Sequence, residues 1–197
     1  MKYVFGLFVG FSLFIGGAFG AQEMPYHIPD VVTHQIKSTN VDQTFAIHVW
    51  QPMTKKDGSE KFPVLYITDA NGGISMAELM HYLHLGGDAP RFIMVGIGYP
   101  VDHALGGLNI RNRDLTPTPS AQLEAESGLP VDGVPSITSG KKSGGAKEFL
   151  SFIRDELVPF IDENYNTIEG DRGFFGDSLG GLFGLYTLFH EPDTFSR

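Results

Sequence analysis

The sequence predicts an α/β fold in which helices cover a mostly parallel sheet. Apolar runs with strand character alternate with segments of helical periodicity, and glycine-rich breaks separate them. The composition suits a packed core, because 42% of the 197 residues are hydrophobic and they include 16 Phe, 7 Tyr and one Trp. A chain of this length and apolar content is typical of one domain rather than of a disordered polypeptide.

Charge and cysteine content exclude several classes of function. The chain has 14 Lys and Arg against 23 Asp and Glu, so its formal net charge is −9. A negative protein repels phosphate backbones, which argues against nucleic acid as a partner. The absence of cysteine excludes a disulfide scaffold, a thiolate zinc site and a cysteine nucleophile.

The first 20 residues resemble a secretory signal peptide. Lys2 precedes an apolar run from Val4 to Ile15, and the small residues Ala18 and Gly20 stand where a signal peptidase would recognise them. The alternative is an uncleaved membrane anchor, but the run is short for a span of about 20 residues. We therefore expect cleavage after residue 20, a mature domain over 21–197, and a secreted or periplasmic protein that meets the membrane only during export.

Four strands are expected in the first half of the mature chain, the last two of them buried on both faces because their apolar runs are nearly continuous. A helix is expected between these two, where apolar residues recur at helical spacing. The expected strands are 31–38, 44–50, 62–68 and 92–98, and the expected helix is 74–85.

The second half begins with an irregular excursion over residues 99–145, which has no clear period and many prolines and glycines. Such a long segment usually shapes a functional cleft. An amphipathic helix is expected over 146–165, kinked or divided by Pro159. A short apolar strand, a glycine-rich turn and an apolar helix over 182–190 follow.

The turn carries the pattern Gly176-x-Ser178-x-Gly180, which predicts a nucleophile elbow. A serine at the tip of a strained strand-to-helix turn needs small neighbours two positions away on either side. Its hydroxyl then points out of the carboxyl end of the sheet, toward the free N–H groups of the following helix. The alternative is a glycine-rich turn with an exposed serine and no chemistry.

A serine nucleophile also needs an oxyanion hole, for which the sequence offers two backbone N–H groups. One belongs to Leu179, directly after the serine, and the other is expected in the loop after the third strand. Asn71 is the candidate in that loop, with Gly72 next. The alternative is that Asn-Gly-Gly is only a turn before a helix.

These segments resemble the putative esterase family of α/β-hydrolases, which includes esterase D type enzymes, mycolyltransferases and siderophore esterases. The similar stretches are Tyr66–Gly73 and Arg172–Phe195, and Arg111–Pro117 resembles the siderophore-esterase branch. The resemblance covers about residue 30 onward and implies a three-layer sandwich. Asp177 departs from it, because the family often has histidine there.

The family also implies a catalytic acid and a histidine after the serine in chain order. Only 19 residues follow Ser178, so we expect the acid, the histidine and the last strands to lie beyond residue 197, in a longer parent enzyme. By itself the chain is expected to be nearly inactive.

None of the histidines in the sequence is a confident general base. His190 is expected at the far end of the last helix, roughly 18 Å from Ser178 at 1.5 Å per residue. His81 and His84 could form half of a metal site, but no third ligand is evident. His103 could line a cleft in the excursion.

The sequence thus predicts a serine esterase that forms an acyl-enzyme on Ser178 and acts on a small-molecule ester, with no cofactor and no metal. Arg111 and Arg113 could bind an anionic substrate such as a catecholate siderophore. The alternative for both is a solvated loop charge paired with Asp114. A non-catalytic binding domain and an acyltransferase are the alternative functions.

Overall fold

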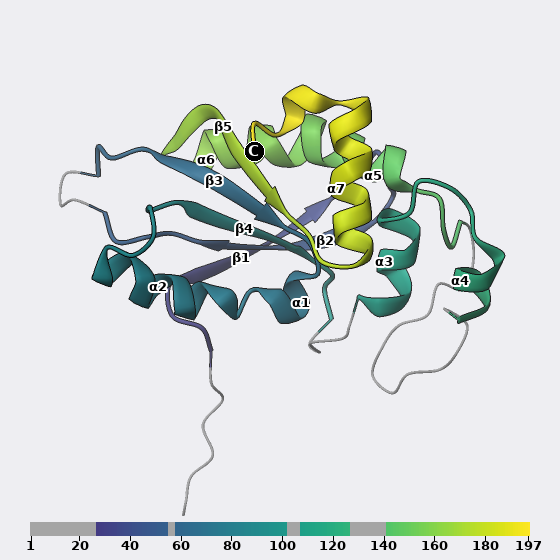
Figure 1. Ribbon diagram of the computed structural model, residues 1–197, viewed down its shortest axis with the longest axis horizontal. Helices are drawn as coiled ribbons and strands as arrows, with labels where there is room; N and C mark the ends of the chain where they lie inside the picture. Colours follow the sequence, from purple (N-terminus) through teal and green to yellow (C-terminus); the bar gives the residue numbers. More distant parts are fainter. Residues whose placement is uncertain (1–26, 55–57, 102–106, 127–140) are drawn as a thin grey trace, which may run out of the picture.

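The computed structural model describes residues 27–54, 58–101, 107–126 and 141–197, and five strands in this part of the chain form one sheet in the order β1-β2-β4-β3-β5 (Figure 1). The strands are β1 (Val31–Lys37), β2 (Thr44–Trp50), β3 (Phe62–Ile67), β4 (Ile93–Gly98) and β5 (Thr167–Phe175). The four expected strands of the first half are confirmed within one residue at each end.

The sheet is mostly parallel. Strands β3, β4 and β5 run parallel to one another, while β2 is antiparallel to both β1 and β4. Four of the five described strands therefore point in the same direction and β2 points the other way. The carboxyl ends of β3, β4 and β5 converge beside α1, α3 and the first turn of α7 (Figure 1).

Helices cover both faces of the sheet, which gives three layers (Figure 1). One face is covered by α1 (Ala70–Gly73) and α2 (Met76–Gly86). The other is covered by α5 (Ala146–Phe152), the π-helical segment η1 (Ile153–Leu157), α6 (Val158–Asn164) and α7 (Leu179–His190). The short η2 (Pro192–Thr194) follows α7.

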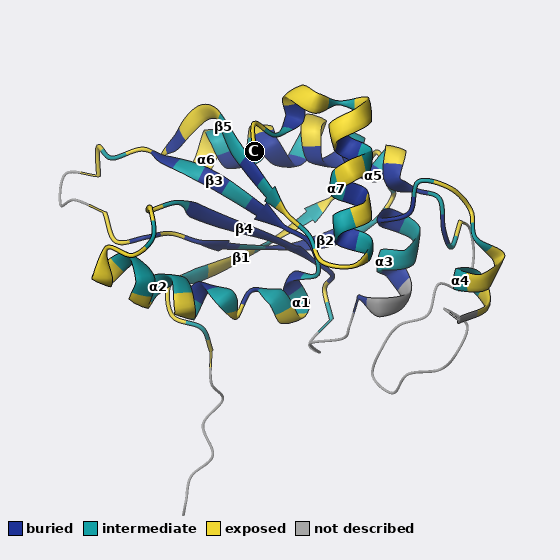
Figure 2. Ribbon diagram, viewed as in Figure 1, coloured by how far each residue is buried: buried dark blue, intermediate teal, exposed yellow. Residues whose placement is uncertain are grey.

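Two apolar cores lie between these layers, and Figure 2 shows the sheet as the buried middle of the molecule. The larger core stacks Phe45 of β2 on Phe152 of α5, with ring centroids 4.3 Å apart, and includes Phe149 and Phe183. The smaller core packs Trp50 and its neighbours against α1 and α2. All six residues of β4 are buried, as its continuous apolar run predicts.

Helix boundaries differ from the sequence expectation in two places. The helix expected over 74–85 is preceded by the extra turn α1, and the helix expected from Leu182 begins at Leu179, directly after the serine. The helix expected over 146–165 is divided as predicted. The π-helical segment η1 ends at Leu157, two residues before Pro159, which has no N–H to donate.

The excursion is less irregular than predicted. It contains α3 (Leu108–Asp114) and α4 (Ala121–Glu126), and α3 is fixed because Ile110 packs into the larger core. Seven- and six-residue helices escape a periodicity analysis, since too few turns repeat the pattern. His103 lies outside the described residues, and so does the signal peptide predicted over residues 1–20.

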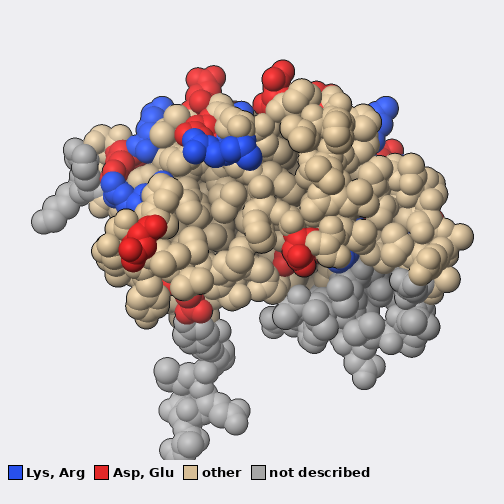
Figure 3. Space-filling model, in the orientation of Figure 1, with Lys and Arg blue, Asp and Glu red and all other residues tan. Residues whose placement is uncertain are grey.

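The described residues include no helix with the length and apolar character needed to span a membrane. On the face shown in Figure 3, Lys and Arg side chains form separate groups among acidic ones. This face carries no continuous basic surface in the part of the chain that the structure describes.

Candidate active site at the carboxyl ends of β3 and β5

Ser178 stands at a sharp turn between β5 and α7. Its backbone has φ 55° and ψ −118°, a conformation that non-glycine residues rarely adopt, and its side chain is exposed. Such strain costs on the order of 1–3 kcal/mol and persists only where the surroundings impose it. The backbone therefore has the geometry that the Gly-x-Ser-x-Gly pattern predicts for an elbow.

The flanking glycines are required by close packing. A Cβ atom at Gly176 would lie 2.4 Å from the carbonyl carbon of Gly180, and a Cβ atom at Gly180 would lie 2.4 Å from Thr68 Oγ1. Neither position can hold a larger residue unless backbone or a buried side chain moves. These contacts also show that the elbow lies against the end of β3.

The backbone N–H of Leu179, at the start of α7, is free of a helical partner. Leu179 is the first residue of the helix and follows Ser178 directly, so its N–H has no acceptor within the helix. The Leu182 N–H already donates to the Ser178 carbonyl at 3.2 Å. The positive end of the α7 dipole thus lies at the serine.

The loop predicted to supply the second oxyanion donor is the short helix α1. Asn71 is its second residue, so its N–H also has no helical acceptor. The Asn71 side chain is fully used elsewhere: Nδ2 donates to the carbonyls of Tyr99 and Val101 at 2.8 and 3.0 Å, and Oδ1 accepts from the Tyr99 N–H at 2.8 Å. This side chain fastens α1 to the chain leaving β4.

Two glycines of β4 let α1 approach the sheet. A Cβ atom at Gly96 would lie 2.6 Å from Ala70 Cβ, and one at Gly98 would lie 2.8 Å from Asn71 Oδ1 and 3.3 Å from the Asn71 nitrogen. The Gly-Ile-Gly end of β4 therefore leaves room for α1 to pack directly against the strand. This role was not predicted from the sequence, where these glycines read only as part of a buried strand.

The solvated-charge alternative, in which Arg111 pairs with Asp114, is wrong for this residue, because Arg111 pairs with Asp69. Its guanidinium binds the carboxylate of Asp69 in a two-pronged contact, Nε to Oδ1 at 2.6 Å and Nη2 to Oδ2 at 2.9 Å. Asp69 directly precedes α1 in a left-handed conformation, with φ 58°. Its Oδ2 lies 3.6 Å from the Cβ position of Gly180, so this ion pair lies beside the first turn of α7.

Arg113 pairs with Asp114, as that alternative supposed, but the pair is buried rather than solvated. Nε and Nη2 of Arg113 donate to Asp114 at 2.6 and 3.0 Å, and the Tyr99 hydroxyl donates to Oδ2 at 2.9 Å. The Asp114 side chain has no exposed surface. Burial raises the pKa of Asp114, opposed by the hydrogen bonds from Arg113, and burial also raises the pKa of Tyr99 well above 10.

No hydrogen bond joins a histidine ring to Ser178 among the described residues. His190 ends α7 and stacks on Tyr186. His84 lies between Trp50 and Phe92, and the described residues contain no group of three or more His, Cys, Asp or Glu side chains that could hold a metal ion. His48 Nδ1 bonds Thr33 Oγ1 at 2.9 Å, and burial lowers its pKa.

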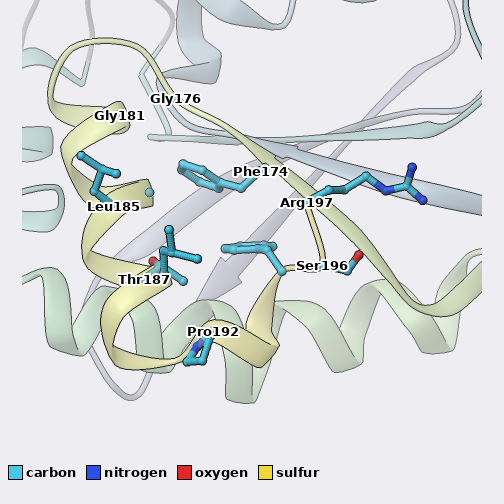
Figure 4. Close-up of a pocket in the computed structure, with 11 residues that line it drawn as sticks. Phe174, Gly176, Gly181, Leu185, Thr187, Pro192, Ser196 and Arg197 are labelled. Atoms are coloured by element: carbon cyan, nitrogen blue, oxygen red, sulfur yellow. The ribbon is translucent and has the colours of Figure 1, made fainter.

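A mainly apolar hollow of about 340 Å³ lies between α7 and β5 (Figure 4). Phe174 and Leu185 line it, together with Ser196 and Arg197 near the end of the chain. Gly176 and Gly181 also line it, but Ser178 does not. The hollow therefore lies beside the elbow and not around the serine.

A strained serine between a strand and a helix, on a mostly parallel sheet whose β2 is reversed, defines the α/β-hydrolase class. The family described as Putative esterase matches residues 124–197. Ferri-bacillibactin esterase BesA of Bacillus subtilis (strain 168) is 31% identical over 182 residues, which are 89% of this chain and 59% of BesA. Residues 124–197 thus match the putative esterase family, and the chain is similar over most of its length to a siderophore esterase.

Solved structures agree. The BES protein from Bacillus cereus superimposes with a TM-score of 0.72 at 26% identity, covering 89% of this chain and 62% of BES. An IroE-like serine hydrolase from Shewanella oneidensis superimposes with a TM-score of 0.66 at 28% identity, covering 84% and 48%. The chain thus spans about half to three-fifths of the length of these relatives.

Proposed function

We propose that the protein is a serine esterase of the siderophore-esterase type, with Ser178 as its nucleophile. The observation that carries the proposal is that Ser178 is exposed and has a strained backbone at the start of α7, directly before Leu179, whose N–H has no helical acceptor. The match to a ferri-bacillibactin esterase supports ester hydrolysis as the reaction and a siderophore ester as the substrate class.

In the proposed reaction, the Ser178 oxygen attacks the ester carbonyl carbon while its proton passes to a general base. The carbonyl oxygen becomes an oxyanion, held by the N–H groups of Leu179 and Asn71, and each such donor is worth about 2.7–4 kcal/mol. The alcohol then leaves with a proton, and water releases the acid from the acyl-enzyme.

The general base and its acidic partner are proposed to come from outside the described residues. Loss of the base from a serine triad lowers turnover by a factor on the order of 10⁶. The described residues alone are therefore expected to hydrolyse esters very slowly, and activity tests should use the whole gene product.

We assign Arg113 no direct substrate contact, because its guanidinium is held by the buried carboxylate of Asp114. Arg111 lies nearer to the elbow than Arg113 does, because it pairs with Asp69, whose carboxylate lies beside Gly180. The proposed localisation, secreted or periplasmic, follows from the signal-like residues 1–20 and agrees with an enzyme that meets siderophores.

A fluorophosphonate probe followed by peptide mass spectrometry tests the nucleophile. We expect the label on Ser178 and none in the Ser178→Ala variant. Hydrolysis of a catecholate siderophore lactone, followed by chromatography of the acid released, tests the substrate class. Failure of the whole gene product to label would favour a non-catalytic binding domain, and ester formation with an added alcohol would indicate an acyltransferase.

A further inference from the structure

We propose that Asp69 and Arg111 are a positioning pair for the oxyanion loop, here defined as Asp69–Gly73. The inference rests on the proposed function, since it concerns how the Asn71 N–H is held toward the serine. Neither residue acts on the substrate. The pair fixes the loop, and Arg111 neutralises a carboxylate that would otherwise repel the developing oxyanion.

The geometry of the pair suits fixation. Two parallel hydrogen bonds of 2.6 and 2.9 Å hold the Asp69 carboxylate in one orientation, whereas a single contact would let it rotate. The Arg111 side chain is 13% exposed and that of Asp69 is 33% exposed, so water screens the pair less than it screens a surface pair.

The Arg111 end of the pair is anchored. Helix α3 also carries Asp114, whose buried carboxylate binds Arg113 and the Tyr99 hydroxyl. Leu115 packs into the larger core directly after the helix. Arg111 therefore extends from a fixed helix to the loop, while the Asn71 side chain holds the same loop from the β4 side.

The position of Asp69 makes neutralisation necessary. Its Oδ2 lies 3.6 Å from the Cβ position of Gly180, next to the helix start that supplies the Leu179 N–H. An unpaired carboxylate there would raise the energy of an oxyanion bound to that N–H, because like charges at short range repel strongly where water is partly excluded.

The two effects give a specific order of activities. Arg111→Gln leaves an unpaired carboxylate and a loosened loop, so kcat should fall on the order of 100-fold. Asp69→Asn loosens the loop but removes the charge, so the fall should be on the order of 10-fold. The double variant should be more active than Arg111→Gln alone. Arg111→Lys keeps the charge but loses the two-pronged contact, so its kcat should fall on the order of 10-fold, as in Asp69→Asn.

The test measures kcat and KM on the whole gene product with one neutral and one anionic ester, together with the rate of fluorophosphonate labelling and the thermal midpoint. Asp42→Asn is the matched control: Asp42 also has a left-handed backbone, φ 54°, and also pairs with a cation, Lys37, but on the β1–β2 turn. It should label at the rate of the unchanged protein.

The inference predicts falls in kcat for both esters with KM within about threefold, and labelling rates in the same order. If Arg111→Gln raises KM for the anionic ester only, and the double variant is no better, Arg111 binds substrate directly and the inference is overturned. Equal labelling of all variants overturns it as well. Absence of labelling in the unchanged protein is a different result, because it overturns the proposed function itself.

Discussion

A Cβ atom on Gly176 would lie 2.4 Å from the carbonyl carbon of Gly180, across the turn that presents Ser178. The obstacle is backbone, so it cannot swing away as a side-chain end can. The turn is thus closed by a contact between two glycines. The end of β5 and the first turn of α7 approach each other so closely that the backbone of the serine between them is strained.

Substitution of Gly176 by Ala should therefore open the elbow. We expect a loss of about 1–3 kcal/mol in the free energy of unfolding, the cost of overpacking, and a lower rate of labelling at Ser178. Urea denaturation measures the first and fluorophosphonate labelling the second. Gly86→Ala is the control, because the atom nearest its Cβ is the carboxylate end of the exposed Asp88, which can move. Equal stability of the two variants would contradict the argument.

Ser178→Gly should stabilise the protein while removing its nucleophile. Glycine adopts φ 55° without the 1–3 kcal/mol strain, but it loses about 0.5–1 kcal/mol to the greater freedom of the unfolded chain. We therefore expect an unfolding free energy higher by up to about 2.5 kcal/mol. Ser178→Ala keeps the Cβ and the strain, and its stability should equal that of the unchanged protein. A glycine variant less stable than the alanine variant would show that the turn stores no strain.

Removal of the Arg113 guanidinium should destabilise the protein strongly. Arg113→Met leaves Asp114 buried without its partner, which typically costs about 3–5 kcal/mol at neutral pH. Burial raises the pKa of Asp114, so the folded variant takes up a proton more readily than the unfolded chain, and the loss should shrink as the pH falls toward 4.

Urea titrations at pH 7 and 4.5 measure this effect. Arg113→Met with Asp114→Asn should recover part of the stability, because the double variant buries no charge. If Arg113→Met changed only KM for an anionic ester, Arg113 would be a substrate ligand instead.

Stability should also fall on acidification because of His48. Burial lowers the pKa of its ring below the ordinary 6.5, so between the two pKa values the unfolded chain binds more protons than the folded one. The contribution of the neutral His48 ring to the free energy of unfolding is therefore complete above pH 6.5 and decreases as the pH falls below 6.5. His48→Gln should flatten the stability profile between pH 7.5 and 5.5, as measured by urea denaturation at several pH values in this range, and an unchanged profile would contradict the argument.

The sequence by itself determined the elements with strong periodicity or strong local chemistry. The strands follow from apolar runs, the division of the long helix follows from Pro159, and the elbow follows from Gly176-x-Ser178-x-Gly180. Each of these depends on neighbours within a few residues, where the pattern and the backbone geometry are directly linked.

Only the tertiary structure decided which charges meet. Arg111 pairs with Asp69, 42 positions away, and not with the nearby Asp114, because α3 lies beside the carboxyl ends of β3 and β5. Tertiary packing also decides that Arg113 is buried and that α1 packs against Gly96 and Gly98. The packing of strands and helices decides which residues distant in the chain become partners. A local sequence pattern contains no information about that packing.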